Sequence, residues 1–294
     1  MSVFPTKILL ATDGSEDARR ATEVATDLAG NSGSELHVVH VWHDVPGFAH
    51  AFVKRELRRQ GQEILDEQVK KIEESGGTVT RAHLRGGRTS DEVVGLSEEL
   101  RVGLLVVGSR GLGTVRRILM GSHSEEIVHN ARVPLLVVRR GESAWPPSRV
   151  IIGEDFSDDA RRAGELAAGI GALYGTQVLL VYVHPGLPQV PPEEAREAAA
   201  EKLSGAREQE MLEDRANELG EILGGRPEIL VSGGNPAAVM LQAAQGETPP
   251  PLIAVGSRGI AGIRRTRLGS VSTKLVTAAP GPVLIYPHVE QNRG

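Results

Sequence analysis

Two copies of one sequence pattern run along the chain, and this duplication limits the possible folds more than any other feature. Ile8–Ser15 matches Val150–Ser157, an offset of 142 residues (150 minus 8). Leu104–Gly111 matches Leu252–Gly259, an offset of 148 (252 minus 104). Because similar segments recur in the same order in both halves, we expect two domains with the same fold.

The length of 294 residues suits two domains of about 140 residues each. Between the copies lies Arg139–Ser148, whose Gly and paired prolines cannot continue a helix or a central strand. We therefore predict one domain at 1–142 and a second at 143–294.

Within the first copy, short apolar runs alternate with stretches of helical periodicity. The predicted strands are 7–12, 35–42, 78–84, 104–108 and 134–139, and the predicted helices are 15–31, 51–75, 89–101 and 121–130. Such alternation predicts an α/β fold in which right-handed crossovers join parallel strands. Each copy is expected to be a doubly wound, Rossmann-like domain with a five-stranded parallel sheet in the order 3-2-1-4-5.

Composition excludes several classes of protein. The formal charge of -5 and pI of about 6.0 provide no basic field for nucleic acid or an anionic membrane, so neither is an expected partner. The absence of cysteine excludes disulfides and thiolate sites. No apolar run reaches the length of a membrane span, and the N-terminal run is too short for a signal peptide. A cytoplasmic location is the expectation.

Polar and glycine-rich segments follow two of the predicted strands. Asp13 comes after the first strand, and Gly108 begins a loop after the fourth. In a doubly wound sheet these strand ends are neighbours, and ligands bind there. The loop reads Gly108, Gly111, nine residues, then Gly121-Ser122, and the second copy repeats the spacing with Gly256, Gly259 and Gly269-Ser270. Glycine backbone and a helix start suit a phosphate group. Asp13, Asp155, Ser122 and Ser270 are also good helix caps, which leaves a purely structural role open.

This spacing in both halves closely resembles the ATP-binding members of the universal stress protein family, which carry G-x-x-G, nine residues, then G-[ST]. The resemblance covers almost the whole chain and implies an adenine nucleotide (ATP, ADP or AMP), with or without Mg²⁺. It places Asp13 and Asp155 near the ribose and adenine, and the backbone of Val41 and Val183 at the base. The residues that it implies around the phosphates are Gly108, Arg110, Gly111, Gly121, Ser122, His123 and Ser124 in the first copy, and Gly256, Arg258, Gly259, Gly269, Ser270, Val271 and Ser272 in the second.

The two copies depart from each other at the expected site. Phe156 follows Asp155 where Gly14 follows Asp13, and His123 follows Ser122 where Val271 follows Ser270. The two sites are therefore not expected to be equivalent.

The resemblance implies a nucleotide-dependent regulator or sensor in the stress response. No Walker lysine or carboxylate cluster accompanies the loops, so we expect at most slow ATP hydrolysis or autophosphorylation, at Ser122 or Ser270. His123 and His129 are six residues apart (129 minus 123), not the four that a helical zinc pair needs, and we expect no metal held by protein ligands. The alternatives are a nucleotide-free dimerisation scaffold and, less favoured, an adenylate-transferring enzyme.

Assembly is predicted from the apolar final strands, 134–138 and 282–286, which would be sheet edges in the expected order. Their pairing would make each chain an intramolecular pseudo-dimer, and two chains are expected to form a homodimer.

Overall fold

The computed structural model describes residues 4–44, 51–109, 122–139, 145–188, 206–257 and 268–288. The chain divides into two compact units, Pro5–Gly141 and Glu142–Gly294, with Met1–Phe4 assigned to the latter. The predicted boundary near residue 143 falls among residues 140–144, outside the described ranges. The domain limits 1–142 and 143–294 stay a prediction.

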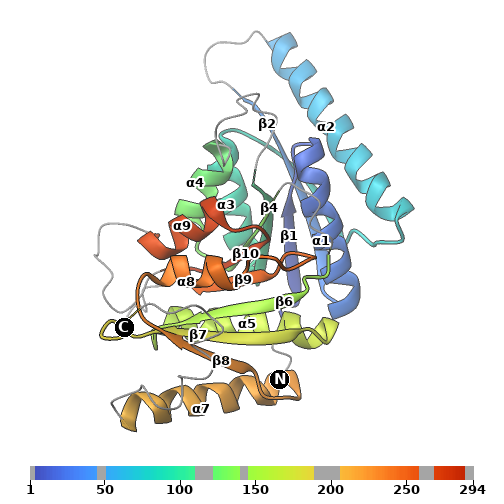
Figure 1. Cartoon of the computed structure of the whole chain (residues 1–294). Helices are drawn as coiled ribbons and strands as arrows, with labels where there is room; N and C mark the ends of the chain where they lie inside the picture. Colours follow the sequence, from blue (N-terminus) through green and yellow to red (C-terminus); the bar gives the residue numbers. More distant parts are fainter. Residues whose placement is uncertain are drawn as a thin grey trace, which may run out of the picture. The chain divides into compact units, whose positions relative to one another are not determined.

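The first unit alternates strands and helices in the expected order (Figure 1). Its elements are β1 (Lys7–Ala11), α1 (Glu16–Ser32), β2 (Glu35–Trp42), α2 (Ala51–Glu74), β3 (Arg81–Gly86), α3 (Thr89–Glu99), β4 (Leu104–Gly108), α4 (Ser122–Asn130) and β5 (Leu135–Val138).

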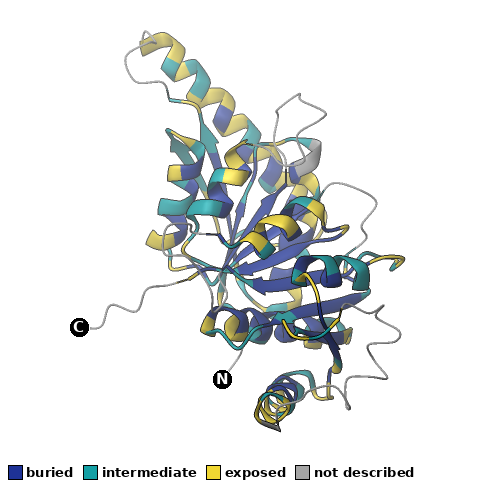
Figure 2. Cartoon of the chain, turned by 60° about the vertical axis from the view of Figure 1, so that its left-hand side comes forward, coloured by how far each residue is buried: buried dark blue, intermediate teal, exposed yellow. Residues whose placement is uncertain are grey.

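The strands of this unit lie in the order β3-β2-β1-β4-β5, and each neighbouring pair is parallel. Ile8 of β1 pairs with Leu36 on one side and Leu104 on the other. Ile8, Leu9 and Leu10 are 0% exposed, because a parallel sheet is covered on both faces. Figure 2 shows most of the strand residues in the colour of buried residues, with many exposed residues on the helices. The edge strand β3 differs, because its residues are exposed or partly buried.

Helices cover both faces of this sheet. α1 and α2 pack against the strands and against each other, while α3 and α4 pack together. α1 begins where the Ser15 hydroxyl accepts a hydrogen bond from the Ala18 N–H at 3.1 Å, and ends at Gly33 in the left-handed conformation. Both are standard signals for the ends of a helix.

β3 begins three residues later than the sequence predicts, at Arg81 and not at 78. Among the described strands it pairs with β2 alone, where Arg81 lies opposite His37 and Gly86 opposite Trp42. An edge strand has one pairing partner and a weak apolar pattern, so the register with β2 decides its limits more than its own sequence does.

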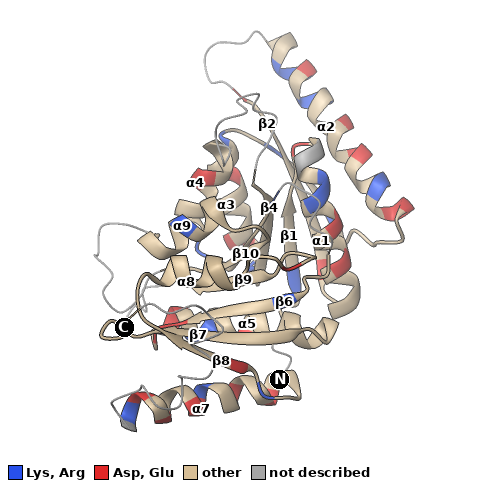
Figure 3. Ribbon diagram, in the orientation of Figure 1, with Lys and Arg blue, Asp and Glu red and all other residues tan. Residues whose placement is uncertain are grey.

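α2 exposes a charged surface to solvent. Figure 3 shows acidic and basic residues along its length, and Arg59 forms an ion pair with Glu56 at 2.6 Å while Lys71 pairs with Glu67 at 2.7 Å. Gly61, Leu65, Gln68 and Ile72 are its buried residues. α2 is therefore an amphipathic helix whose buried stripe faces the sheet.

The second unit repeats the element order, with an additional stretch before its second helix. Its described elements are β6 (Arg149–Glu154), α5 (Asp158–Tyr174), β7 (Gln177–Val183), α7 (Ala206–Leu223), β8 (Glu228–Ser232), α8 (Pro236–Ala243), β9 (Leu252–Gly256), α9 (Ser270–Ala278) and β10 (Val283–Tyr286).

This unit has the strand order β10-β9-β6-β7-β8, again with parallel neighbours. Ser157 caps α5 by accepting from the Ala160 N–H at 3.2 Å, and Gly175 ends it in the left-handed conformation. The Nε1 of Trp145 donates to the Tyr174 hydroxyl at 3.1 Å. Two tandem doubly wound α/β domains are thus confirmed as the fold class. Among the described helices, none is long and apolar enough to cross a membrane.

A pair of histidines links β2 and β3. His37 Nδ1 lies 3.1 Å from His83 Nε2, and the two rings stack with centroids 5.3 Å apart. Between two facing ring nitrogens one must donate and the other accept, so the contact requires at least one neutral ring. Burial and the neighbouring His37 lower the pKa of His83 to about 4.

The His83 pKa predicts a loss of stability in mild acid. Between the unfolded value of about 6.5 and the folded value of about 4, the unfolded chain binds a proton that the folded chain does not. The free energy of unfolding should therefore fall as pH drops from 6.5 towards 4. Urea unfolding of the wild type and His83→Gln at several pH values measures this. The variant should lose less stability over that window, and parallel curves would contradict the assignment.

Candidate functional site

The carboxyl ends of β1 and β4 meet where the strand order of the first sheet reverses. β2 and β5 lie on opposite sides of this central pair, so the loops that follow β1 and β4 diverge to opposite faces. Asp13 stands two residues beyond the end of β1, and Gly108 is the last residue of β4. The diverging loops thus leave a crevice between them, and Asp13 and Gly108, where the glycine-rich loop begins, both lie at this crevice.

A cavity of about 420 Å³ occupies this crevice, a volume within the usual range for small-molecule sites. Its lining comes from three strands or strand ends (β1, β2 and β4) and from helices on both faces. The lining residues are Ala11, Thr12, Asp13, Ala18, Val39, His40, Val41, Trp42, His43, Leu57, Gln60, Gly61, Ile64, Thr89, Val93, Val107, Gly108, Ser122, His123, Ser124 and Ile127.

Six of the residues chosen from the sequence share this cavity. They are Asp13, Val41, Gly108, Ser122, His123 and Ser124. The predicted residues Arg110, Gly111 and Gly121 lie outside the described part of the chain.

Asp13 shapes its loop and also faces the cavity. Its Oδ1 accepts a hydrogen bond from the Ser15 N–H at 3.0 Å, while Gly14 between them has a φ of +76°. This is a tight turn closed by an Asx-type contact, and Ser15 then caps α1. The capping role and a role in the site are therefore compatible, because one carboxylate oxygen holds the turn while the residue lines the cavity.

A serine hydroxyl fixes the start of α4 against the end of β4. Ser124 Oγ donates to the Gly108 carbonyl at 2.8 Å, and Ser124 is buried. Ser122 and His123 are exposed in the preceding half-turn. The free N–H groups at a helix start carry partial positive charge, so the exposed start of α4 suits an anionic group.

α2 supplies a wall of the cavity that sequence reasoning missed. Leu57, Gln60, Gly61 and Ile64 recur at helical spacing on its cavity side. A Cβ at Gly61 would lie 2.9 Å from the Trp42 Cβ, so only glycine allows this approach to β2. A glycine inside a strongly helical stretch was the available signal, since it costs helix stability and needs another reason to be there.

His40, another residue missed from the sequence, has a defined tautomer. Its Nδ1 lies 2.9 Å from the Thr12 carbonyl, and the residue is 6% exposed. A carbonyl oxygen can only accept, so Nδ1 carries the proton. This contact ties the end of β2 to the β1 turn.

In the second unit the predicted residues lie at the matching strand ends and helix start. Asp155 follows β6, Val183 ends β7, Gly256 ends β9, and Gly269 caps α9, which begins with Ser270, Val271 and Ser272. Ser272 Oγ donates to the Gly256 carbonyl at 2.7 Å, as Ser124 does to Gly108 in the first unit. Arg258 and Gly259 fall outside the described residues.

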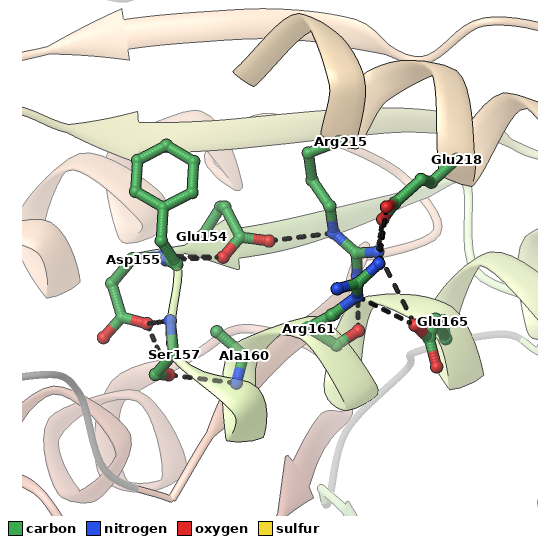
Figure 4. Close-up of polar contacts among 9 residues, drawn as sticks. Glu154, Asp155, Ser157, Ala160, Arg161, Glu165, Arg215 and Glu218 are labelled. Atoms are coloured by element: carbon green, nitrogen blue, oxygen red, sulfur yellow. Dashed lines mark hydrogen bonds and ion pairs between the residues drawn. The ribbon is translucent and has the colours of Figure 1, made fainter. Parts of the chain in front are cut away.

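An ion pair lies beneath the Asp155 loop of this unit (Figure 4). The Glu154 carboxylate contacts the Arg215 Nε at 3.0 Å, and their side chains are 1% and 5% exposed. The second Glu154 oxygen accepts from the Phe156 N–H at 2.7 Å. Burial raises the pKa of Glu154, and the charge of Arg215 acts in the opposite direction.

Comparison with known proteins identifies the family to which the chain belongs. The model of the universal stress protein family matches residues 5–139 and again 147–287. These two matches cover most of the chain, so the chain belongs to the universal stress protein family, as a tandem two-domain member.

Relatives of two lengths match the chain. A universal stress protein of Mycolicibacterium smegmatis is 25% identical over 302 residues, covering 95% of this chain and 96% of that protein. One from Thermus aquaticus is 34% identical over 133 residues, which cover 45% of this chain and 97% of that protein. The crystal structure of a universal stress protein from Archaeoglobus fulgidus matches with a TM-score of 0.72 and 25% identity, covering 95% of this chain and 97% of that one.

Gly61 should tolerate alanine less well than another helical glycine does. The new Cβ would meet Trp42 at 2.9 Å, and such overpacking costs more than the roughly 1 kcal/mol that alanine gains in a helix. We expect Gly61→Ala to lower the free energy of unfolding by about 1 kcal/mol. Gly95→Ala in α3, where a Cβ meets nothing within 4 Å, should raise it. Equal shifts of both variants in urea unfolding would contradict the packing assignment.

Arg215 should be essential for the stability of the second unit. Arg215→Ala leaves the Glu154 carboxylate buried without its charged partner, which should cost about 3–5 kcal/mol. Arg226→Ala is the matched control, because its pair with Glu213 is about half exposed (53% and 45%) and should change stability by less than about 1 kcal/mol. Urea unfolding followed by circular dichroism compares the two, and a small effect of Arg215→Ala would refute the role given to the buried pair.

Proposed function

We propose that the chain binds an adenine nucleotide (ATP, ADP or AMP), with or without Mg²⁺, in the cavity of the first unit. The observation that carries this proposal is the convergence of Asp13, Val41, Gly108 and Ser122 on one cavity of about 420 Å³. Their elements are far apart in sequence, and the doubly wound topology brings them to one crevice.

The parts of the nucleotide match the parts of the cavity. Asp13 offers a carboxylate to ribose hydroxyls, and Val41 offers its backbone at the side where apolar residues of α2 would cover a base. The phosphates would lie towards Gly108 and the start of α4, where Ser122 and His123 are exposed. Arg110, Gly111 and Gly121 are proposed to complete the phosphate site.

The role that we propose is a nucleotide-dependent regulator or sensor in the stress response. A ligand can shift a conformational equilibrium by its differential affinity for two states, so binding suffices for regulation. Among the described residues no group of three or more His, Asp or Glu is arranged to hold a metal. Slow ATP hydrolysis or autophosphorylation at Ser122 or Ser270 is the most activity that we propose, and both serines are exposed at helix starts.

Assembly and location are part of the same proposal. The two family domains in one chain suit an intramolecular pseudo-dimer, and two chains are proposed to form a homodimer in the cytoplasm. A regulatory protein partner is also proposed.

The sequence also predicts a second nucleotide site at the counterpart residues of the second unit. Its members are Asp155, Val183, Gly256, Arg258, Gly259, Gly269, Ser270, Val271 and Ser272. The spacing of the glycines supports that prediction, and the different side chains around Asp155 oppose it.

The test is nucleotide release followed by a binding measurement on a conservative variant. Purified protein is denatured, released nucleotide is identified by chromatography, and ATP affinity is measured for the wild type and Asp13→Asn. Asparagine keeps the oxygen that accepts from Ser15 N–H, but it removes the charge offered to ribose hydroxyls. Loss of one charged hydrogen bond, about 1.4 kcal/mol, corresponds to an approximately tenfold weaker affinity.

Asp66→Asn is the matched control, because Asp66 is exposed on α2 outside the cavity lining. Its affinity for ATP should equal that of the wild type. If no nucleotide is released and added ATP does not bind, the nucleotide-free dimerisation scaffold becomes the better account.

A further inference from the structure

We propose that the second unit fills the counterpart of the first cavity with its own side chains, Phe156, Tyr182 and Glu208, so that the chain binds a single nucleotide, in the first unit. This inference rests on the proposed function, since it concerns where the nucleotide can bind. On this inference, the second unit keeps the fold of the first but has larger side chains in the position of the first unit's cavity.

The strand register identifies the first two matching positions. Glu154 of β6 pairs with Tyr182 of β7. At the offset of 142 residues between the copies, Glu154 matches Thr12 (154 minus 12) and Tyr182 matches His40 (182 minus 40). Phe156 then matches Gly14, because each stands two residues further along its loop. Of these first-unit residues, Thr12 and His40 line the cavity.

The buried stripe of the second helix identifies the third position. Leu65, Gln68 and Ile72 are buried in α2, and the buried residues 147 positions later are Leu212, Arg215 and Leu219 of α7 (212 minus 65). By the same offset, Glu208 matches Gly61 (208 minus 61). The glycine that lets α2 approach β2 in the first unit is thus replaced by a long side chain in the second.

Tyr182 contacts both of the other two side chains. The rings of Phe156 and Tyr182 have centroids 5.0 Å apart, and Tyr182 is 7% exposed. Glu208 accepts a hydrogen bond from the Tyr182 hydroxyl and lies 3.2 Å from His184 Nε2. Phenylalanine, tyrosine and glutamate therefore form a packed, hydrogen-bonded cluster where the first unit has Gly14, His40 and Gly61. Of these three, His40 and Gly61 line the first-unit cavity.

The backbone conformation of Phe156 indicates that its neighbours hold this side chain in place. Its φ is +62°, in the left-handed region that bulky residues avoid, and the matching Gly14 has +76°. The turn is therefore conserved between the copies while the residue best suited to it has been replaced. A strained phenylalanine persists where the surrounding contacts hold it, and here Tyr182 and the Glu154 carboxylate do so.

The ion pair between Glu154 and Arg215 also helps to hold the loop after β6 in place. Glu154 accepts from the N–H groups of Asp155 and Phe156 at 3.1 and 2.7 Å, while Arg215 of α7 holds its other oxygen. The matching first-unit residues, Thr12 and Gln68, are uncharged. The β6 turn is thereby tied to α7, the helix that also carries Glu208.

The experiment measures both the number of bound nucleotides and their location. Isothermal titration with ATP gives the stoichiometry of the intact chain, and photolabelling with 8-azido-ATP followed by peptide mass spectrometry gives the labelled segment. We expect one equivalent per chain and label confined to residues 5–141. Two equivalents, or label within residues 142–294, would overturn this inference and leave the proposed function intact. No binding at all would overturn the proposed function and this inference with it.

A variant tests whether the three side chains are the cause. Phe156→Gly/Tyr182→His/Glu208→Ala places small or first-unit residues in the second unit and should bring the stoichiometry to two, with label in both units. Phe156→Gly alone serves as a second variant, because glycine suits the left-handed turn; we expect partial label in the second unit. If both variants fold, as judged by circular dichroism, and still bind one equivalent, these side chains do not close the site and the inference fails.

Discussion

A parallel sheet must be covered on both faces, and this constraint organises each unit of the chain. The middle of each central strand is buried, as Ile8, Leu9 and Leu10 are in β1, so polar and glycine residues gather mainly where strands end. At the point of reversed strand order the covering helices separate, and the sheet itself leaves a crevice. The position of the candidate site is thus a consequence of how the core is buried.

Much of the fold was predictable because its signals are local. Apolar runs located β1, β2 and β4, and the Ser15 and Gly33 caps of α1 are strong start and stop signals. The limits of β3 were not predictable from its own sequence, because this edge strand takes its register from β2. In the site, the duplicated glycine spacing pointed to Gly108 and Ser122, which line the cavity.

The α2 wall and the second-unit cluster could not be predicted, because they depend on contacts between distant segments. Nothing local to Gly61 says that it faces Trp42, and nothing local to Arg215 says that its partner is Glu154. These contacts can be recognised only when α2 and α7 are aligned with each other. In that alignment the buried residues Gln68 and Arg215 occupy the same position. Duplicated domains diverge in this way, by changing residues that meet in space and lie apart in sequence.

Each unit contains one of the two tryptophans of the chain, and their surroundings differ. Trp42 lines the first cavity, whereas Trp145 donates to Tyr174 and meets its ring edge-on with centroids 5.6 Å apart. Indole emission responds to solvent and to stacked rings, so the unmodified chain carries its own optical probe of the crevice beside a reference in the other unit. Replacing Trp145 by phenylalanine would leave Trp42 as the single tryptophan, through whose emission filling of the crevice could be followed in real time without any attached dye.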